Sequence, residues 1–205
     1  MALLLSLCRD VPNLDRHTRN GLWKSESTAI ELRGKNIGLI GFGGIGQQFS
    51  QLCKAFGMDV FVWTRSMNLE YTKQFGVRLC SLEEIYERCK IISLHLASNP
   101  QTQGTIDHAA FDAMQPGTLL LHTARAELVV EDAMIHALQT GKLRAAAMDV
   151  FHQEPLPNGH PLLKMENVVL TPHVGYNTPE AVSRLYAIAS ETLVSYVSGN
   201  PVNVV

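Results

Sequence analysis

The strongest constraint on the fold is the alternation of short apolar runs with amphipathic helical segments. The runs are three to seven residues long and lie at residues 36–41, 60–63, 91–94, 118–122, 144–150 and 168–170. Runs this short and apolar are typical of strands that are buried on both faces. Buried strands that alternate with helices indicate a parallel sheet covered by helices on both sides. We therefore predict an α/β fold with a doubly wound parallel sheet.

The helices between these strands carry their own signals. Residues 81–84 read Ser-Leu-Glu-Glu, a capping box that opens a helix through Arg88. A second helix is expected over 131–139, ending at Gly141, and a long one over 179–197 with an apolar stripe. Ligands of such folds bind beyond the carboxyl ends of the strands, so the loops at those ends are the candidate functional segments.

Composition excludes several classes of function. The 205 residues hold 17 Lys and Arg against 19 Asp and Glu, a net charge of −2, so no nucleic-acid partner is expected. No apolar run is long enough for a membrane span. The apolar start, residues 1–8, lacks the charged segment and cleavage site of a secretory signal, so we expect a helix packed on the domain. The four cysteines show no metal-binding spacing, which favours reduced thiols in a cytoplasmic protein and no metal site.

A glycine-rich loop follows the first predicted strand. Gly41-Phe-Gly43-Gly-Ile-Gly46 has the spacing G-x-G-x-x-G between a strand and a helix, the context that the pattern requires. Gly41 permits a tight turn, Gly43 lets a pyrophosphate approach the main chain, and Gly46 lets the helix pack on the strand. The helix N-terminus supplies N–H groups for phosphates. Although a glycine turn can also occur without a ligand, this context favours a Rossmann-type dinucleotide site.

The next strand ends at the residues that choose between dinucleotides. An acidic residue there would bind the adenine ribose and repel a 2′-phosphate, but this chain has Thr64-Arg65-Ser66. A guanidinium pairs well with a phosphate, so the local chemistry favours NADP(H) over NAD(H). The alternative is that Arg65 is only a solvated surface charge.

Three further polar groups follow predicted strands. Arg125 lies beyond 118–122, Glu154 beyond 144–150 in the sequence Asp149-Val-Phe-His-Gln-Glu154-Pro, and His173 beyond 168–170 in Thr-Pro-His-Val-Gly175. Together they offer a guanidinium, a carboxylate and an imidazole at one edge of the sheet. Any one of them alone is more often structural than catalytic.

With the glycine loop, these segments resemble the D-isomer-specific 2-hydroxyacid dehydrogenases over nearly the whole chain and in the same order. The resemblance implies that Arg125 binds the substrate carboxylate and carbonyl, that His173 is the general acid/base and that Glu154 supports it. It also implies that Asp149 and the segment 94–102 lie near the cofactor. The residues expected to contact the cofactor are Gly41, Gly43, Gly44, Ile45, Gly46, Thr64, Arg65, Ser66, His95, Leu96, Thr102, Thr123, Ala124, Arg125, Asp149, His173 and Gly175.

The chain departs from the family pattern at several positions. The family usually has Asn at His122, Gly at Ala126 and Asp at Val130, and the 94–102 loop is altered at Ala97 and Asn99. The resemblance also implies a separate N-terminal substrate domain ahead of this chain. We expect residues 1–20 to be the crossover from it, 21–178 the dinucleotide-binding domain, and 179–205 a C-terminal helix and tail.

The resemblance implies interconversion of 2-oxo acids and D-2-hydroxy acids by hydride transfer, in a homodimer formed through the nucleotide domain. We expect the 205-residue chain to bind dinucleotide but to turn over 2-oxo acids slowly or not at all. A dinucleotide-sensing regulator with the same fold is an alternative. Formate-type oxidation is another, although that chemistry goes with Gln where this chain has Glu154.

Overall fold

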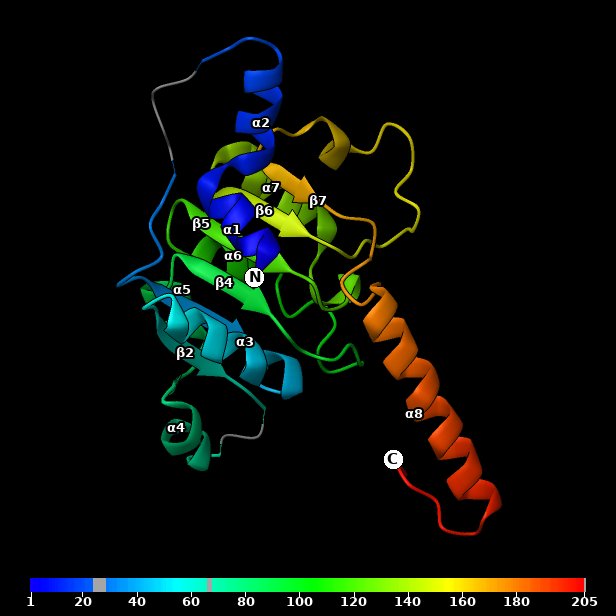
Figure 1. Ribbon diagram of the computed structural model, residues 1–205. Helices are drawn as coiled ribbons and strands as arrows, with labels where there is room; N and C mark the ends of the chain where they lie inside the picture. Colours follow the sequence, from blue (N-terminus) through cyan, green and yellow to red (C-terminus); the bar gives the residue numbers. More distant parts are fainter. Residues whose placement is uncertain (24–28, 66–67, 205) are drawn as a thin grey trace. The chain divides into compact units, whose positions relative to one another are not determined.

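The fold is built on a sheet of seven parallel strands in the order β3-β2-β1-β4-β5-β6-β7 (Figure 1). The structure, a computed structural model, describes residues 1–23, 29–65 and 68–204. All neighbouring strands run parallel, so the predicted doubly wound sheet is confirmed. The strands are β1 (Asn36–Ile40), β2 (Asp59–Trp63), β3 (Arg78–Leu79), β4 (Ile91–Leu94), β5 (Thr118–His122), β6 (Leu143–Met148) and β7 (Val168–Leu170).

Helices cover both faces of this sheet, each over its own hydrophobic core. One core contains Leu4, Phe49 and Cys53, from α1 (Ala2–Arg9) and α3 (Gly44–Ala55), with α4 (Glu70–Phe75) at its edge. The other contains Ile85, Phe111 and Ala133, from α5 (Leu82–Arg88), α6 (His108–Ala113) and α7 (Glu131–Thr140). Strand residues alternate between the two cores, as the pleat requires: Leu39 faces the first and Ile40 the second. The predicted two-sided burial is therefore confirmed.

The local signals in the sequence act as predicted. The Ser81 hydroxyl accepts from the Glu84 amide at 3.2 Å, and the Glu84 carboxylate accepts from the Ser81 amide at 3.1 Å. Gly141 ends α7 in the left-handed region, with φ of 78°. The sequence patterns did not predict β3, α4 or α6, which have two, six and six residues and are too short for a clear period. The short 3₁₀ helices η1 (Ala126–Leu128) and η2 (Pro161–Lys164) were also not predicted.

The apolar start of the chain forms the helix that the sequence predicts. Leu4 and Cys8 of α1 are buried against the sheet. Asp10, with φ of 52°, then turns the chain into α2 (Val11–Arg19), none of whose residues is buried. No helix in the described part of the chain combines the length and apolarity that a bilayer crossing needs.

The chain divides into two compact units, Met1–Pro172 and His173–Val205. The sheet and both cores lie in the first unit. The second contains α8 (Pro179–Val197), which begins where the Thr178 hydroxyl accepts from the Ala181 amide at 3.1 Å. The expected helix over 179–197 is therefore present, and its side chains Leu185, Ile188, Leu193 and Tyr196 are exposed.

Strand β1 meets β4 at the point where the sheet changes winding direction, and two glycines permit the close packing there. A Cβ on Gly41, whose φ is 101°, would lie 2.7 Å from the main-chain nitrogen of Leu96. A Cβ on Gly46 would lie 2.7 Å from the carbonyl oxygen of Gly41. Gly43 has extended backbone, with φ of −74°, and a Cβ there would meet no atom within 4 Å. The first two glycines are therefore required by packing, and Gly43 is not.

This contrast predicts that two alanine substitutions differ in their effect on stability. Gly46→Ala should lower the free energy of unfolding by about 1–3 kcal/mol, because main-chain atoms must move to admit the methyl group. Gly43→Ala should change it by less than about 1 kcal/mol, since the site is open and the backbone angle suits alanine. Urea unfolding of both variants beside the wild type measures the difference. Equal destabilisation by the two substitutions would contradict this account of the loop.

Candidate functional site

The candidate site lies at the carboxyl edge of the sheet, where main-chain hydrogen bonds fix the first residue after several strands. The amide of Gly41 donates to the Trp63 carbonyl at 2.8 Å, and that of His95 to the Ile40 carbonyl at 2.7 Å. Farther along the edge, the amide of Asp149 donates to the His122 carbonyl at 3.1 Å. The loops that carry the predicted residues of the first unit therefore leave from one common edge.

The glycine loop fits a phosphate-bearing group. Gly43 is the N-cap of α3 and has no side chain to occupy the helix terminus, so no side-chain cap is made there. The first-turn amides of Gly44, Ile45 and Gly46 therefore remain available, at the positive end of the helix dipole. The space where a Gly43 side chain would lie is open. This is the arrangement that a dinucleotide pyrophosphate requires.

The predicted selectivity residues follow β2 next to this loop. Thr64 comes directly after the last strand residue, Trp63, and Arg65 is exposed. Because β2 lies beside β1 in the sheet, both residues start from the edge that carries Gly41. Ser66 lies outside the described residues.

The loop after β4 is held mainly by its own contacts. The Thr102 side chain is buried, and its hydroxyl donates to the Ala97 carbonyl at 2.7 Å and accepts from the Asn99 amide at 2.9 Å. The His95 ring packs 5.2 Å from the Phe49 ring, and its Nε2 lies 2.9 Å from the Ser93 hydroxyl. The side chains of Thr102 and His95 are thus used to hold the loop. The groups of this loop that remain for the expected cofactor contacts are its main chain and the Leu96 side chain.

Arg125 presents its side chain to solvent two residues beyond Thr123, the first residue after β5. One N–H of its guanidinium donates to the Ala124 carbonyl at 2.8 Å, which holds the side chain close to its own loop. A guanidinium has five N–H donors in all, so a planar face remains for a carboxylate. The geometry therefore suits the anion-binding role that the sequence predicts.

The two predicted carboxylates differ in their surroundings. Asp149 is buried, and its Oδ1 accepts a short hydrogen bond from the Thr171 hydroxyl, which links the ends of β6 and β7. Glu154 is exposed, and its Oε1 accepts from the Phe151 amide at 2.9 Å. That bond fixes one oxygen of Glu154 and aligns the loop after β6.

His173 is the first residue of the second unit, whereas Arg125 and Glu154 belong to the first. His173 has φ of 52°, a left-handed conformation that is uncommon away from glycine and is often found at functional sites. Its ring lies 6.4 Å from the Tyr176 ring in an edge-on arrangement. Gly175, also a predicted contact, is exposed in the same segment.

His122 is a buried residue whose environment the sequence does not reveal. It ends β5, is completely inaccessible to solvent, and neither ring nitrogen has a hydrogen-bond partner in the described structure. Burial lowers its pKa to about 4, although the nearby Ala126 main chain acts in the opposite direction. Burial likewise lowers the pKa of His95 to about 4. Both rings are therefore neutral at pH 7, and neither supplies a proton there.

Two residues that the sequence patterns did not single out support the site. Ser93 anchors the His95 ring, and Thr171 anchors Asp149. Thr171 stands two positions before His173, so its place in the Thr-Pro-His sequence was a usable signal. Ser93 had none, because a serine inside an apolar run predicts only a strand. Among the residues that the structure describes, no group of three or more His, Cys, Asp or Glu side chains is placed to hold a metal ion.

The two buried histidines predict a loss of stability in mild acid. Their folded pKa values lie below the ordinary 6.5, so between about pH 6.5 and 4 the unfolded chain binds protons that the folded chain does not. Stability should be fully present above pH 6.5 and fall as the pH drops, by about 2 kcal/mol per histidine at pH 5. Urea unfolding at pH 7.5 and pH 5 measures this fall.

The matched comparison for this prediction uses two other variants. His122→Asn removes one of the two titrations, so its loss between pH 7.5 and 5 should be smaller than that of the wild type. His136→Asn, at an exposed position, should leave the wild-type loss unchanged. Identical losses in all three proteins would show that the burial of His122 does not govern the pH dependence.

Comparison with known proteins places this site in a family. The D-isomer specific 2-hydroxyacid dehydrogenase NAD binding domain matches residues 1–175. D-3-phosphoglycerate dehydrogenase of Archaeoglobus fulgidus is 36% identical over 203 residues, which are 98% of this chain and 38% of that protein. Glyoxylate reductase of Aeropyrum pernix is 36% identical over 213 residues, covering 100% of this chain and 64% of the relative.

A solved structure also matches the whole of this chain. An acyclic imino acid reductase, Bsp5, in complex with NADPH and D-Arg, superposes with a TM-score of 0.89 at 30% identity, and the match covers 100% of this chain and 65% of that one. The chain thus spans only part of the length of each of these proteins. The match over residues 1–175, together with the glycine loop and the order of the strand-end residues, shows that the chain belongs to the D-isomer specific 2-hydroxyacid dehydrogenase family, as its NAD binding domain.

Proposed function

We propose that this chain belongs to an oxidoreductase that interconverts 2-oxo acids and D-2-hydroxy acids with a nicotinamide dinucleotide. One observation carries the proposal: the exposed guanidinium of Arg125 starts from the same sheet edge as a helix N-terminus with an open glycine loop. The first feature suits a small carboxylate and the second a dinucleotide phosphate. The relatives named as a glyoxylate reductase and a D-3-phosphoglycerate dehydrogenase support this reaction class and favour an enzyme over a sensor.

Each residue in the proposed reaction has a role that follows from its chemistry. The bound dinucleotide supplies or accepts the hydride. Arg125 binds the substrate carboxylate and stabilises negative charge that develops on the carbonyl oxygen. His173 donates a proton to that oxygen in reduction and removes it in oxidation. The family resemblance assigns Glu154, already held by the Phe151 amide, the role of supporting the protonated form of His173.

Substitution of His173 tests this mechanism in the protein at its full natural length. His173→Ala should lower kcat for a 2-oxo acid by roughly 10²–10⁴-fold, the usual contribution of a general acid. Dinucleotide affinity should change little, because the glycine loop is intact. Steady-state turnover with a panel of 2-oxo acids, with calorimetry of cofactor binding, separates the two effects. Full turnover without His173 would refute the proposed acid, and no turnover of any 2-oxo acid by the wild type would favour the sensor.

We further propose that the chain prefers NADP(H) to NAD(H). Thr64 and Arg65 follow β2 directly and present no carboxylate to an adenine ribose, while Arg65 is exposed and cationic. The acyclic imino acid reductase whose structure contains NADPH is a relative with the same fold. A guanidinium at this point would pair with the 2′-phosphate that distinguishes the two cofactors.

Calorimetry with both cofactors tests the preference. Arg65→Ala should weaken NADPH binding by about 1–3 kcal/mol, the range for a hydrogen bond to a charged group. NADH binding by the same variant is the internal control and should change little. Tighter binding of NADH than of NADPH by the wild type would overturn the proposal.

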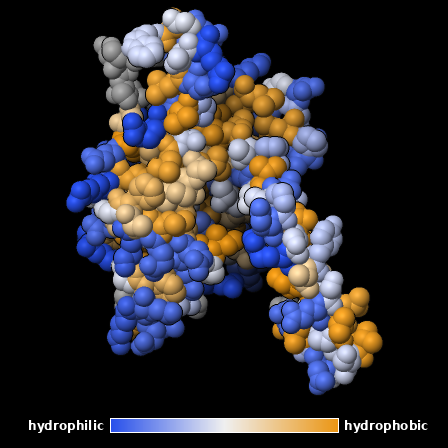
Figure 2. Space-filling view, in the orientation of Figure 1, coloured by the Kyte–Doolittle hydropathy of each residue, from blue (hydrophilic) through white to orange (hydrophobic). Residues whose placement is uncertain are grey.

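We also propose that two copies of the chain associate through α1 and α3. Figure 2 shows apolar side chains gathered on the face where α1 lies. Ile45 and Leu52 of α3 and its C-cap residue Phe56 are 76%, 47% and 42% exposed, and their spacing of seven and four residues places them on one side of the helix. Exposed apolar side chains of this kind favour a protein partner, and a second copy can bury the same surface on both sides.

Sedimentation of two variants tests this association. Leu52→Glu should shift a micromolar solution from dimer to monomer, because it places a charge in the apolar surface. Leu163→Glu makes the same change at an exposed position in η2 and should leave the dimer intact. A wild-type chain that sediments as a monomer at this concentration would exclude the dimer.

The cysteines support a reducing, cytoplasmic location. Cys8, Cys53, Cys80 and Cys89 are all buried free thiols. Burial raises the pKa of Cys53 and of Cys89 to about 12, so both remain protonated and poorly nucleophilic at neutral pH. These thiols therefore have a packing role in the proposed function.

A further inference from the structure

A hollow lies at the opposite, amino edge of the sheet, away from the candidate site, and has a different chemical character. Its volume is about 550 Å³, and it lies among the segments that lead into β1, β4, β5 and β6. Among the residues that the structure describes, its lining includes four cationic residues, Lys35, Arg88, Lys90 and Arg144, and neither an aspartate nor a glutamate. This accumulation of positive charge is notable in a chain whose net charge is −2.

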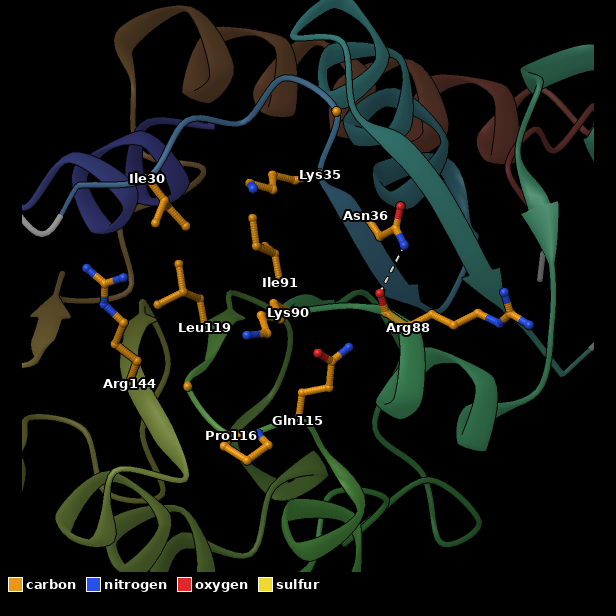
Figure 3. Close-up of a pocket in the computed structure, with 12 residues that line it drawn as sticks. Ile30, Lys35, Asn36, Arg88, Lys90, Ile91, Gln115, Pro116, Leu119 and Arg144 are labelled. Atoms are coloured by element: carbon orange, nitrogen blue, oxygen red, sulfur yellow. Dashed lines mark hydrogen bonds between the residues drawn. The ribbon is translucent and has the colours of Figure 1, made fainter.

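The cationic side chains do not all contribute equally. In Figure 3 the ammonium groups of Lys35 and Lys90 and the guanidinium of Arg144 extend around one open space, whereas the side chain of Arg88 extends away from it. No described carboxylate forms an ion pair with Lys35 or Lys90. Lys35 and Lys90 are therefore the cations open to a ligand, whereas Arg144 has a further interaction of its own.

Part of the lining of the hollow is apolar, and its rim is firmly held. Ile30 is partly exposed and supplies apolar surface, whereas Ile91 and Leu119, which are 2% and 3% exposed, are almost fully covered behind it. Two side-chain bonds hold the rim: the Asn36 amide donates to the Arg88 carbonyl at 3.0 Å, and the Gln115 amide to the Glu87 carbonyl at 2.6 Å. A cleft with charge of one sign over low-dielectric walls concentrates counter-ions.

We propose that this hollow binds a small phosphorylated molecule that carries at least two negative charges. Two ammonium groups from separate loops can each contact a different oxygen of one phosphate or of a pyrophosphate. The apolar wall then suits the carbon skeleton of the ligand. The site would be distinct from the glycine loop, because Lys35 and Lys90 come directly before β1 and β4, whereas Gly41 and His95 come directly after them. Strands of this length separate the two edges by roughly 15–20 Å, so both ligands can bind together.

Calorimetry at low salt measures the affinity of the chain for phenyl phosphate and for inorganic pyrophosphate. The wild type should bind both, phenyl phosphate giving the additional apolar contact, and binding should weaken as salt is added. The double variant Lys35→Ala with Lys90→Ala should lose at least about tenfold in affinity. Arg88→Gln removes a neighbouring cation whose side chain points away, so it should change affinity by less than about threefold.

A second variant separates this hollow from the dinucleotide site, since a phosphate could also bind the glycine loop. Gly43→Ala should weaken dinucleotide binding and leave phenyl phosphate binding unchanged, and the double lysine variant should do the reverse. Loss of phenyl phosphate binding in Gly43→Ala alone would assign it to the glycine loop and overturn the proposal. Absence of binding by the wild type, or equal effects of Arg88→Gln and the double lysine variant, would overturn it as well. None of these outcomes depends on turnover.

Discussion

The main chain of Gly41 lies against that of His95 and Leu96 so closely that no side chain fits between them, and the rest of the site depends on this contact. It brings the ends of β1 and β4 together where the sheet changes winding direction. Gly46 then lets α3 begin directly above Gly41, which points the amino end of that helix over the strand ends. A side chain at Gly41 or Gly46 would displace the helix, and with it the amides that the proposed dinucleotide site needs. One steric condition thus links the packing of the sheet to the position of its functional edge.

Much of this arrangement could be predicted from the sequence, because buried parallel strands leave a clear trace. Runs such as 91–94 and 118–122 are apolar throughout, and their bounds agree with β4 and β5. The capping box at Ser81 and the glycine at 141 act over a few residues, so tertiary context does not alter them. The two residues of β3 are paired only at an edge of the sheet, which leaves almost no hydrophobic period to detect. Asp10 adopts φ of 52° between two helices. Aspartate tolerates this conformation, but an aspartate in the sequence does not predict it.

The candidate site was predictable in its position and less so in its contacts. Placing Arg125 and Asp149 after strands located them at the carboxyl edge, because strand direction alone fixes that edge. Whether a polar side chain is still available for a ligand depends on neighbours that are distant in sequence. The hydroxyl of Thr102 is used within its own loop, and the His95 ring is used by Ser93 and Phe49. His122 is the extreme case: a titratable ring at a strand end that the fold buries, with no hydrogen-bond partner among the described residues. The free-energy cost of burying this ring depends on three-dimensional contacts and cannot be predicted from the sequence.

The two edges of the sheet differ for a reason built into a parallel α/β fold. Helices begin near the carboxyl edge and end near the amino edge, so their dipoles make the first edge attractive to anions and the second to cations. Arg88 is the last residue of α5, and Lys90 follows two residues later. Part of the positive charge at the amino edge therefore compensates the negative end of the α5 dipole. Lys35 has no such explanation, since residues 29–34 form no helix ahead of it. A helix terminus carries only about half a unit charge, which is too little to balance Lys35 and Lys90 together. The excess charge is what makes the amino edge a second place for an anion, despite a dipole pattern that would draw anions to the other edge.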